Sequence, residues 1–175
     1  MSRGVRREIA ARRLAREFAL QGIYQWLLHE CPTEGVPQVQ LPQLHTIEEL
    51  LANAATESMP PKTGSRTEPD ADFFAALLQG AVRNVSETHA IIEPLLTRTI
   101  AELSPVEHAI LLLSVFELRH DTGTPYRVVI NEGIELAKKY GGTDGHKFIN
   151  GVLDRLAPSL RPEEVAFIRA QDKGV

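Results

Sequence analysis

The chain has 175 residues, of which 43% are hydrophobic and 24% charged, so it is long and apolar enough to bury the core of one domain or of two small subdomains. Its longest apolar runs fall short of the roughly 18–20 residues that a membrane span requires. The single cysteine excludes an internal disulfide framework and is typical of a protein from the reducing cytoplasm.

The net charge of -4 is distributed unevenly along the chain. Residues 1–17 contain six arginines and two glutamates, so this arm carries +4 and the remainder carries -8. A basic arm on an acidic body is typical of binding to an anion, most often a nucleic acid. A solvated helix end or an organelle transit peptide would have a similar composition, and charge alone leaves these alternatives open.

Hydrophobic periodicity is helical throughout, which predicts an all-α protein of seven or eight helices. The first helix is expected over Glu8–His29. At 100° per residue, one side of it is a core face and the opposite side is polar with one aromatic residue. The core face consists of Ala15, Phe18, Ala19, Gly22 and Trp26, and the polar face of Arg13, Glu17, Gln21 and Tyr24.

A stretch rich in proline, glycine, serine and threonine follows, and it predicts a flexible insert at residues 32–69 with a short helix at Ile47–Thr56. The next helix is expected to begin at Asp70 or Asp72 and to end near Ile92. We therefore predict two small helical bundles, an N-terminal subdomain of residues 1–95 and a C-terminal subdomain of residues 96–175.

The C-terminal subdomain is marked by clear helix boundaries. A short helix is expected around Thr97–Glu102. In "SPVE", Ser104 is suited to the N-cap, Pro105 to the first helical position and Glu107 to a capping box. The run "AILLLSVFEL" after it is apolar on nearly all sides, which predicts a central helix.

Three further helices are expected toward the C-terminus. The first begins close to Pro125 and ends at Gly141, a residue suited to the left-handed position after a helix. The second covers residues 143–156 and stops before Pro158. The last lies within "RPEEVAFIRAQ".

No pattern in the sequence indicates catalysis. It contains no HExxH motif, no Gly-rich phosphate loop preceded by a strand and no isolated pair of carboxylates suited to acid–base chemistry. We therefore expect a protein that is not an enzyme and that has no metal site and no cofactor. The six histidines are expected to be structural: His29, His45, His89, His108, His120 and His146.

The stretch "KKYGGTDGHKFINGVL" joins two helices through a glycine turn. The N-terminus of the second helix leaves backbone N–H groups near Asp144 that attract anions. Lysines and aromatic residues flank this point, and together they suit single-stranded RNA, whose bases stack on rings while its phosphates meet cations. Solvated lysines beside core aromatics would give the same pattern, and periodicity does not choose between the two. The flanking residues are Lys138, Lys139, Tyr140, Lys147 and Phe148.

Three segments together resemble the NusB family of bacterial transcription antitermination factors. They are the Arg-rich first helix with "AREFALQGIYQW", and later "VVINEGIELAKKYG" and "HKFINGVLD". The resemblance covers the chain apart from about residues 32–69. It implies two perpendicular three-helix bundles without catalytic activity or a cofactor, and binding of the boxA element of single-stranded RNA. Its implied partners are the ribosomal protein that serves as NusE and the RNA polymerase antitermination complex on rRNA operons.

The resemblance also implies roles for individual residues. Glu107 matches a position that the family uses toward its protein partner. Leu112 and Gly133 depart from the family pattern, where arginine and alanine are common, and glycine at 133 would let another backbone approach. The RNA-facing set implied by the resemblance and by the glycine turn is Arg12, Arg13, Arg16, Tyr24, Lys139, Tyr140, Asp144, Lys147 and Phe148, with Asp144 placed to tune it.

Two other functions fit parts of the sequence. Some RNA methyltransferases carry a NusB-like domain ahead of a catalytic domain, but a chain that ends at Val175 is expected to have no room for one. A protein-interaction bundle without specific RNA binding would explain the helices but not the basic arm. A cytoplasmic RNA-binding antitermination factor explains both.

Overall fold

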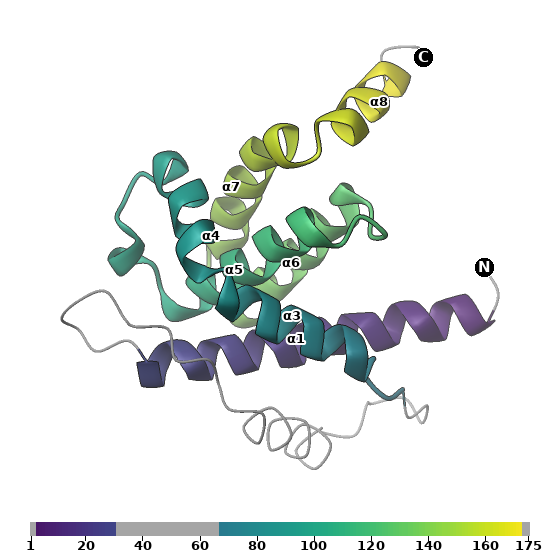
Figure 1. Cartoon of the computed structure of the whole chain (residues 1–175), viewed down its shortest axis with the longest axis horizontal. Coiled ribbons are helices and arrows are strands. Elements are labelled where there is room, and N and C mark those ends of the chain that lie inside the picture. Colours follow the sequence, from purple (N-terminus) through teal and green to yellow (C-terminus); the bar gives the residue numbers. More distant parts are fainter. Residues whose placement is uncertain (1–2, 31–66, 173–175) are drawn as a thin grey trace. The chain divides into compact units, whose positions relative to one another are not determined.

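The computed structural model describes residues 3–30 and 67–172 (Figure 1). These residues form seven α-helices and no strand, so the prediction of an all-α fold is confirmed. None of the described helices is both long and apolar enough to cross a bilayer. The helix expected at Ile47–Thr56 and nearly all of the expected insert lie outside the described residues. The helices are α1 (Arg3–Glu30), α3 (Ala71–Arg83), α4 (Val85–Ile92), α5 (Pro105–His120), α6 (Tyr126–Tyr140), α7 (Gly145–Leu160) and α8 (Pro162–Asp172), with 3-10 turns at Glu93–Leu95 and Ile100–Glu102.

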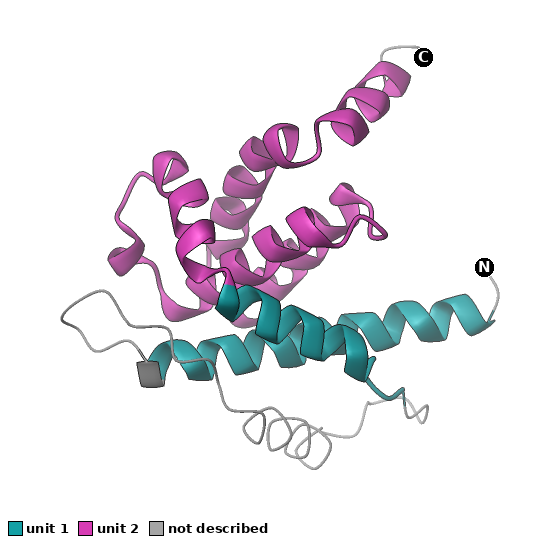
Figure 2. Cartoon of the chain, viewed as in Figure 1, with its two compact units in different colours: residues 1–83 teal, residues 84–175 magenta. Residues whose placement is uncertain are grey.

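The chain divides into two compact units, residues 1–83 and 84–175 (Figure 2). The sequence predicts the division after residue 95. The single helix expected up to Ile92 is instead two helices, α3 and α4, separated at Asn84. Asn84 has φ -101° and ψ 17°, outside the helical region, and asparagine readily leaves a helix because its side chain competes for backbone hydrogen bonds.

In the first unit, α1 lies along α3 and the two helices run in the same direction (Figure 1). The start of α3 is fixed by Asp70, whose N–H donates to the carbonyl of Ala11 at 3.2 Å and whose Oδ1 accepts from the N–H of Phe73 at 3.0 Å. The predicted core face of α1 is buried except at Phe18, which is half-buried. The core of this unit also includes Leu20, Ile23, Leu27, Phe74, Leu77, Leu78, Ala81 and Val82.

In the second unit, α5 is the central helix, as its apolar sequence predicts, and α6 and α7 both pack against it. Its predicted start is confirmed. The N–H of Glu107 donates to Ser104 Oγ at 3.2 Å, and Glu107 Oε2 accepts from the Ser104 N–H at 3.1 Å. This reciprocal capping box satisfies backbone donors that a helix start leaves unpaired.

Two expected helix ends are wrong in detail. Gly141 has φ -88° and ψ 176°, so it is extended rather than left-handed. A β-carbon there would lie 2.6 Å from the carbonyl oxygen of Ala137, which explains the glycine by close approach instead of by conformation. Helix α7 continues through Pro158 to Leu160. Proline is tolerated because it lies in the last turn, where it removes one hydrogen bond and breaks no long helical run.

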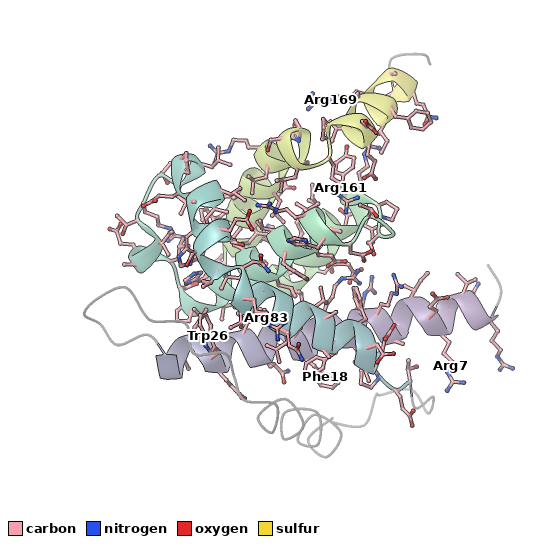
Figure 3. The ribbon with its side chains drawn as sticks, in the orientation of Figure 1. Arg7, Phe18, Trp26, Arg83, Arg161 and Arg169 are labelled. Carbon is pink, nitrogen blue, oxygen red and sulfur yellow. The ribbon has the colours of Figure 1, made fainter. Side chains whose placement is uncertain are left out.

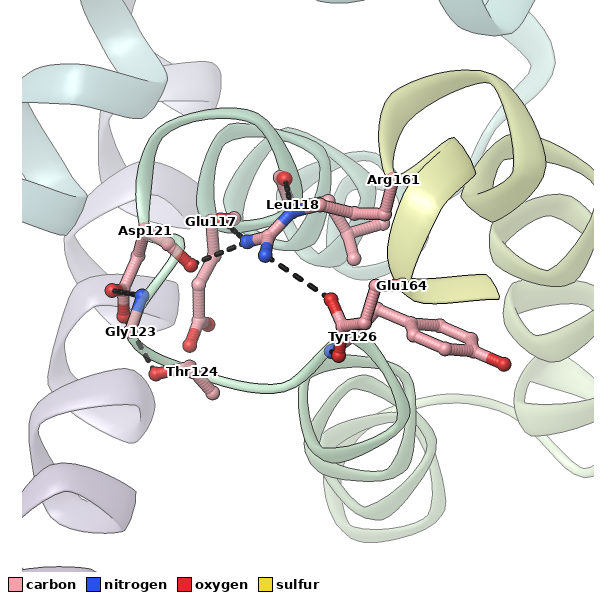
Figure 4. Close-up of polar contacts among 8 residues, drawn as sticks. All are labelled: Glu117, Leu118, Asp121, Gly123, Thr124, Tyr126, Arg161 and Glu164. Carbon is pink, nitrogen blue, oxygen red and sulfur yellow. Dashed lines mark hydrogen bonds and ion pairs between the residues drawn. The ribbon is translucent and has the colours of Figure 1, made fainter. Parts of the chain in front are cut away.

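The start of α8 is fixed to the ends of two other helices by Arg161 and Glu164 (Figure 4). Arg161 is 9% exposed and donates to the carbonyls of Glu117, Leu118 and Asp121 at the C-terminus of α5. It also pairs with Glu164 at 3.3 Å, and Glu164 accepts from the N–H of Tyr126 at 2.9 Å. One short segment therefore satisfies the carbonyls that end α5 and an amide that begins α6.

Candidate nucleic-acid interface

The first group of candidate residues lies on α1, where the predicted arginines differ in exposure. Arg12 is half-buried, Arg13 is exposed and Arg16 is only 4% exposed. The guanidinium carbons of Arg12 and Arg16 each lie 5.0 Å from the centre of the Phe73 ring, and Arg12 Nε is 3.9 Å from Asp70 Oδ2. The first turn of α3 thus orients two of the three arginines through cation–π contacts and a carboxylate.

Within the RNA-facing set expected from the sequence, Arg16 therefore differs from Arg13, because it is buried. Its long apolar stem places it among core side chains, while its guanidinium rests on an aromatic ring. Arg13 and the residues toward the N-terminus remain on the surface, and Arg7 projects from the N-terminal half of α1 (Figure 3). Tyr24 is half-buried further along the same helix. The part of α1 that offers cations to a ligand is its N-terminal half.

The second group lies where α6 ends and α7 begins. Tyr140 is 36% exposed, and Lys139 Nζ lies 5.1 Å from the centre of its ring. Lys147 Nζ and Asp144 Oδ1 are 2.9 Å apart, with both side chains more than 70% exposed. The glycine turn thus presents an aromatic ring, cations and one acidic side chain to solvent.

Phe148, in the first turn of α7, is half-buried and has a neighbour that the sequence analysis missed. The guanidinium carbon of Arg98 lies 4.6 Å from the centre of the Phe148 ring. Arg98 Nη2 also donates to Glu107 Oε2 at 2.9 Å. The sequence predicts a short helix around Thr97–Glu102 that would include Arg98, but in the structure only Ile100–Glu102 is helical, as a 3-10 turn. Arg98 lies just before this turn, so the predicted helix gave no signal for this contact.

Glu107 is engaged within its own unit. Its Oε2 accepts from Arg98 and from both the N–H and the Oγ of Ser104, and its side chain is 13% exposed. Burial by itself raises the pKa of this carboxyl, but the hydrogen bonds from Ser104 and from Arg98 together bring the pKa below its ordinary value. Glu107 is therefore an anion that already has a cationic neighbour.

The two departures from the family pattern lie in the core. Leu112 is a fully buried apolar side chain, and its position carries no charge. A β-carbon on Gly133 would lie 2.9 Å from Ser114 Oγ and 3.2 Å from Leu153 Cδ1. The expectation that another backbone approaches Gly133 is wrong, because the close neighbours are side chains.

Within residues 3–30 and 67–172, no group of three or more His, Cys, Asp or Glu side chains could hold a metal ion. The candidate residues form two sets, one in each unit: arginines arranged around Phe73, and aromatic and charged residues around the start of α7. Cations beside aromatic rings can bind phosphates and stack with bases, and neither set contains a nucleophile and base in contact.

Comparisons with known proteins agree on one family. A model described as the NusB family matches residues 13–158. Transcription antitermination protein NusB of Aromatoleum aromaticum is 49% identical over 157 residues, which cover 90% of this chain and 94% of the relative. The NusB protein of Azoarcus sp. is 48% identical over 161 residues, which cover 92% of each chain.

Solved structures of NusB proteins have the same fold. NusB of T. maritima superposes with a TM-score of 0.66 at 24% identity, covering 89% of this chain and 96% of that one. A structure described as the antitermination factors NusB and NusE in complex with double-stranded RNA superposes with a TM-score of 0.65 at 25% identity, covering 86% and 98% of the two chains.

Proposed function

This chain belongs to the NusB family, and we propose that it is an RNA-binding transcription antitermination factor that acts together with NusE. Two relatives that are nearly half identical to this chain are named transcription antitermination protein NusB. A structural neighbour is described in complex with NusE and double-stranded RNA. The ligand that we propose is a boxA-type single-stranded RNA. The setting is the RNA polymerase antitermination complex on rRNA operons, in the cytoplasm.

The observation that carries the proposal is the arrangement around Phe148. Its ring lies in the first turn of α7, next to Lys147 and against Arg98, and the exposed pair Lys139 and Tyr140 ends the preceding helix. A ring bordered by cations is suited to stack a base while the cations meet the flanking phosphates. In the other unit, α1 would provide phosphate contacts of its own, with Arg13 as the exposed member and Arg12 as the half-buried one.

We assign no catalytic step to this chain. The proposed RNA-facing residues are cations, aromatic rings and Asp144, which suit binding and provide no activated nucleophile. Glu107 is proposed to face the protein partner, because an acidic side chain is complementary to a basic ribosomal protein.

The direct test compares Phe148→Ala with Phe167→Ala in titrations of fluorescent RNA. Phe148→Ala should weaken binding of a boxA-type single strand by roughly 1–3 kcal/mol, because a stacking platform is lost, with no change in the salt dependence. Phe167 is 64% exposed on α8 and serves as a control for the removal of a phenylalanine far along the chain from the glycine turn. A duplex of the same sequence and a scrambled strand should bind more weakly than the boxA-type strand.

Two results would reject the proposal. One is equal affinity for the boxA-type and scrambled strands, which a protein-only adaptor would give. The other is equal loss of affinity from Phe148→Ala and Phe167→Ala. A parallel titration with the NusE ribosomal protein tests the partner, which is expected to raise the RNA affinity.

A further inference from the structure

Arg98 connects the residue proposed to stack on RNA with the residue proposed to face the protein partner. Its guanidinium carbon is 4.6 Å from the centre of the Phe148 ring, and its Nη2 is 2.9 Å from Glu107 Oε2. The Arg98 side chain is 36% exposed, whereas that of Glu107 is 13% exposed. A ligand that approaches Glu107 therefore meets a carboxylate that Arg98 already occupies.

The pairing has a consequence for charge beside the Phe148 ring. Arg98 is neutralised by Glu107, and Lys147 at the start of the same helix is neutralised by Asp144 at 2.9 Å. In the isolated chain, two of the cations available to a phosphate at the start of α7 are thus members of ion pairs. Removing one acidic partner would release a full positive charge at this surface.

Glu107 can exchange its cationic neighbour without losing its structural role. Its hydrogen bonds with Ser104 fix the carboxylate at the start of α5 independently of Arg98. Among the described residues, the second oxygen, Oε1, accepts no hydrogen bond that would compete with an incoming cation. The carboxylate thus remains in place while either Arg98 or an external cation pairs with it.

We propose that Arg98 is a further RNA-binding residue whose availability is controlled by Glu107: a cation of the protein partner pairs with Glu107, and the released guanidinium, still beside Phe148, contacts a phosphate of the RNA. Binding of the partner and binding of the RNA would then strengthen each other by the same factor, as linkage requires. The inference rests on the proposed function, because it takes RNA at Phe148 and a basic protein at Glu107.

The test imitates the partner by removing the charge of Glu107 in the full chain. Glu107→Gln retains a carbonyl oxygen that accepts from Ser104, so the helix cap is largely preserved. It should raise the affinity for the boxA-type strand by about three- to tenfold at low salt and steepen the plot of log K against log salt by about 0.7, the value for one more phosphate contact. In the double variant Glu107→Gln/Arg98→Gln, the rise in affinity and the steeper salt dependence should both disappear.

Glu87→Gln is the matched control. Glu87 pairs with Arg119 at 2.7 Å on the second unit, so this variant has the same change in net charge and releases a different arginine. Arg119 is twelve residues after Glu107 on α5, which places it about 18 Å farther along the helix. Glu87→Gln should therefore leave the salt slope unchanged.

A second measurement uses the partner itself. Adding the NusE ribosomal protein should increase RNA affinity in the parent, and this increase should shrink at least threefold in Arg98→Gln. The inference is overturned if Glu107→Gln raises the RNA affinity no more than Glu87→Gln does. It is also overturned if the affinity of Glu107→Gln stays raised when Arg98 is replaced as well. A parent chain that shows no preference for the boxA-type strand would instead reject the proposed function, and the inference with it.

Discussion

His89 Nε2 lies 2.7 Å from His108 Nε2, so the half-buried imidazole of α4 and the buried imidazole of α5 share a hydrogen bond within the second unit. One ring must donate and the other must accept, which requires at least one neutral imidazole. Burial, and to a lesser extent the charge of His89, lower the pKa of His108 from 6.5 to about 4. Burial also lowers the pKa of His89, against a smaller opposite effect of Glu93.

These shifts predict a loss of stability in mild acid. Below pH 6.5 the unfolded chain binds a proton at His108 that the folded chain refuses until about pH 4, so the free energy of unfolding should fall as the pH falls through this window. Between pH 7.5 and 5 the loss should be about 2 kcal/mol from His108. Urea unfolding at both pH values measures it. His108→Gln should remove most of this dependence, whereas His120→Gln, an exposed histidine on the same helix, should retain it.

Burial also divides the arginines of α1 into two functional kinds. Arg16→Ala should lower the free energy of unfolding by about 1–3 kcal/mol, because it removes a buried stem and a guanidinium stacked on Phe73. Arg13→Ala should cost no more than about 0.5 kcal/mol in stability but should flatten the salt dependence of RNA binding by about 0.7. Chemical unfolding and RNA titration of both variants check this division. Equal destabilisation by the two substitutions would contradict it.

The elements that local sequence specifies were predicted well, and the contacts between elements were not. The capping box at Ser104 and the central α5 follow from residue types at fixed spacing, and both are confirmed. The break at Asn84 was missed because asparagine is compatible both with continuing a helix and with leaving it, so its residue type alone does not place a boundary.

For the candidate site, residue type indicated where cations and rings occur but not which of them touch. The positions of Arg12 and Arg16 are clear from the sequence, yet their contacts with Phe73 join residues more than fifty positions apart. Arg98 lies in an irregular segment before the 3-10 turn at Ile100–Glu102, where the sequence predicts a short helix instead. Its contacts with Phe148 and Glu107 depend on how three elements pack, and a single sequence does not contain that information.

Gly133 offers a test of packing between α6 and its neighbours. Inside a helix, replacing glycine by alanine raises the free energy of unfolding by up to about 1 kcal/mol. At this position, however, the alanine β-carbon would lie 2.9 Å from Ser114 Oγ. Gly133→Ala should therefore be more favourable by about 1 kcal/mol in a Ser114→Ala background than in the parent, because the double variant removes the hydroxyl. A double-mutant cycle by urea unfolding measures the coupling. If the effects of the two substitutions on the free energy of unfolding simply add, the Ser114 side chain can rotate away from the new methyl group at no cost in free energy.

The contacts of Arg161 predict the largest loss of stability from a single substitution. Its buried guanidinium donates to three carbonyls at the end of α5 and pairs with Glu164, which accepts from the amide that begins α6 (Figure 4). Arg161→Ala removes the arginine donor from the carbonyls of Leu118 and Asp121 and leaves Glu164 without its cation, while the Glu117 carbonyl still accepts from the N–H of Asp121. We expect the free energy of unfolding to fall by about 3 kcal/mol or more.

Two further variants separate the hydrogen bonds of Arg161 from its charge. Arg161→Lys preserves the charge but cannot reach several carbonyls at once with a single ammonium, so it should recover only part of the loss. Arg169→Ala removes an exposed arginine from α8, the helix that Arg161 directly precedes (Figure 3), and should change the free energy of unfolding by no more than about 0.5 kcal/mol. Full recovery by lysine would mean that charge, and not the geometry of the guanidinium, fixes α8. Because the glycine turn and Phe148 lie at the start of α7 and Arg161 follows its opposite end, Arg161→Lys should bind RNA with the affinity of the parent under conditions where it remains folded.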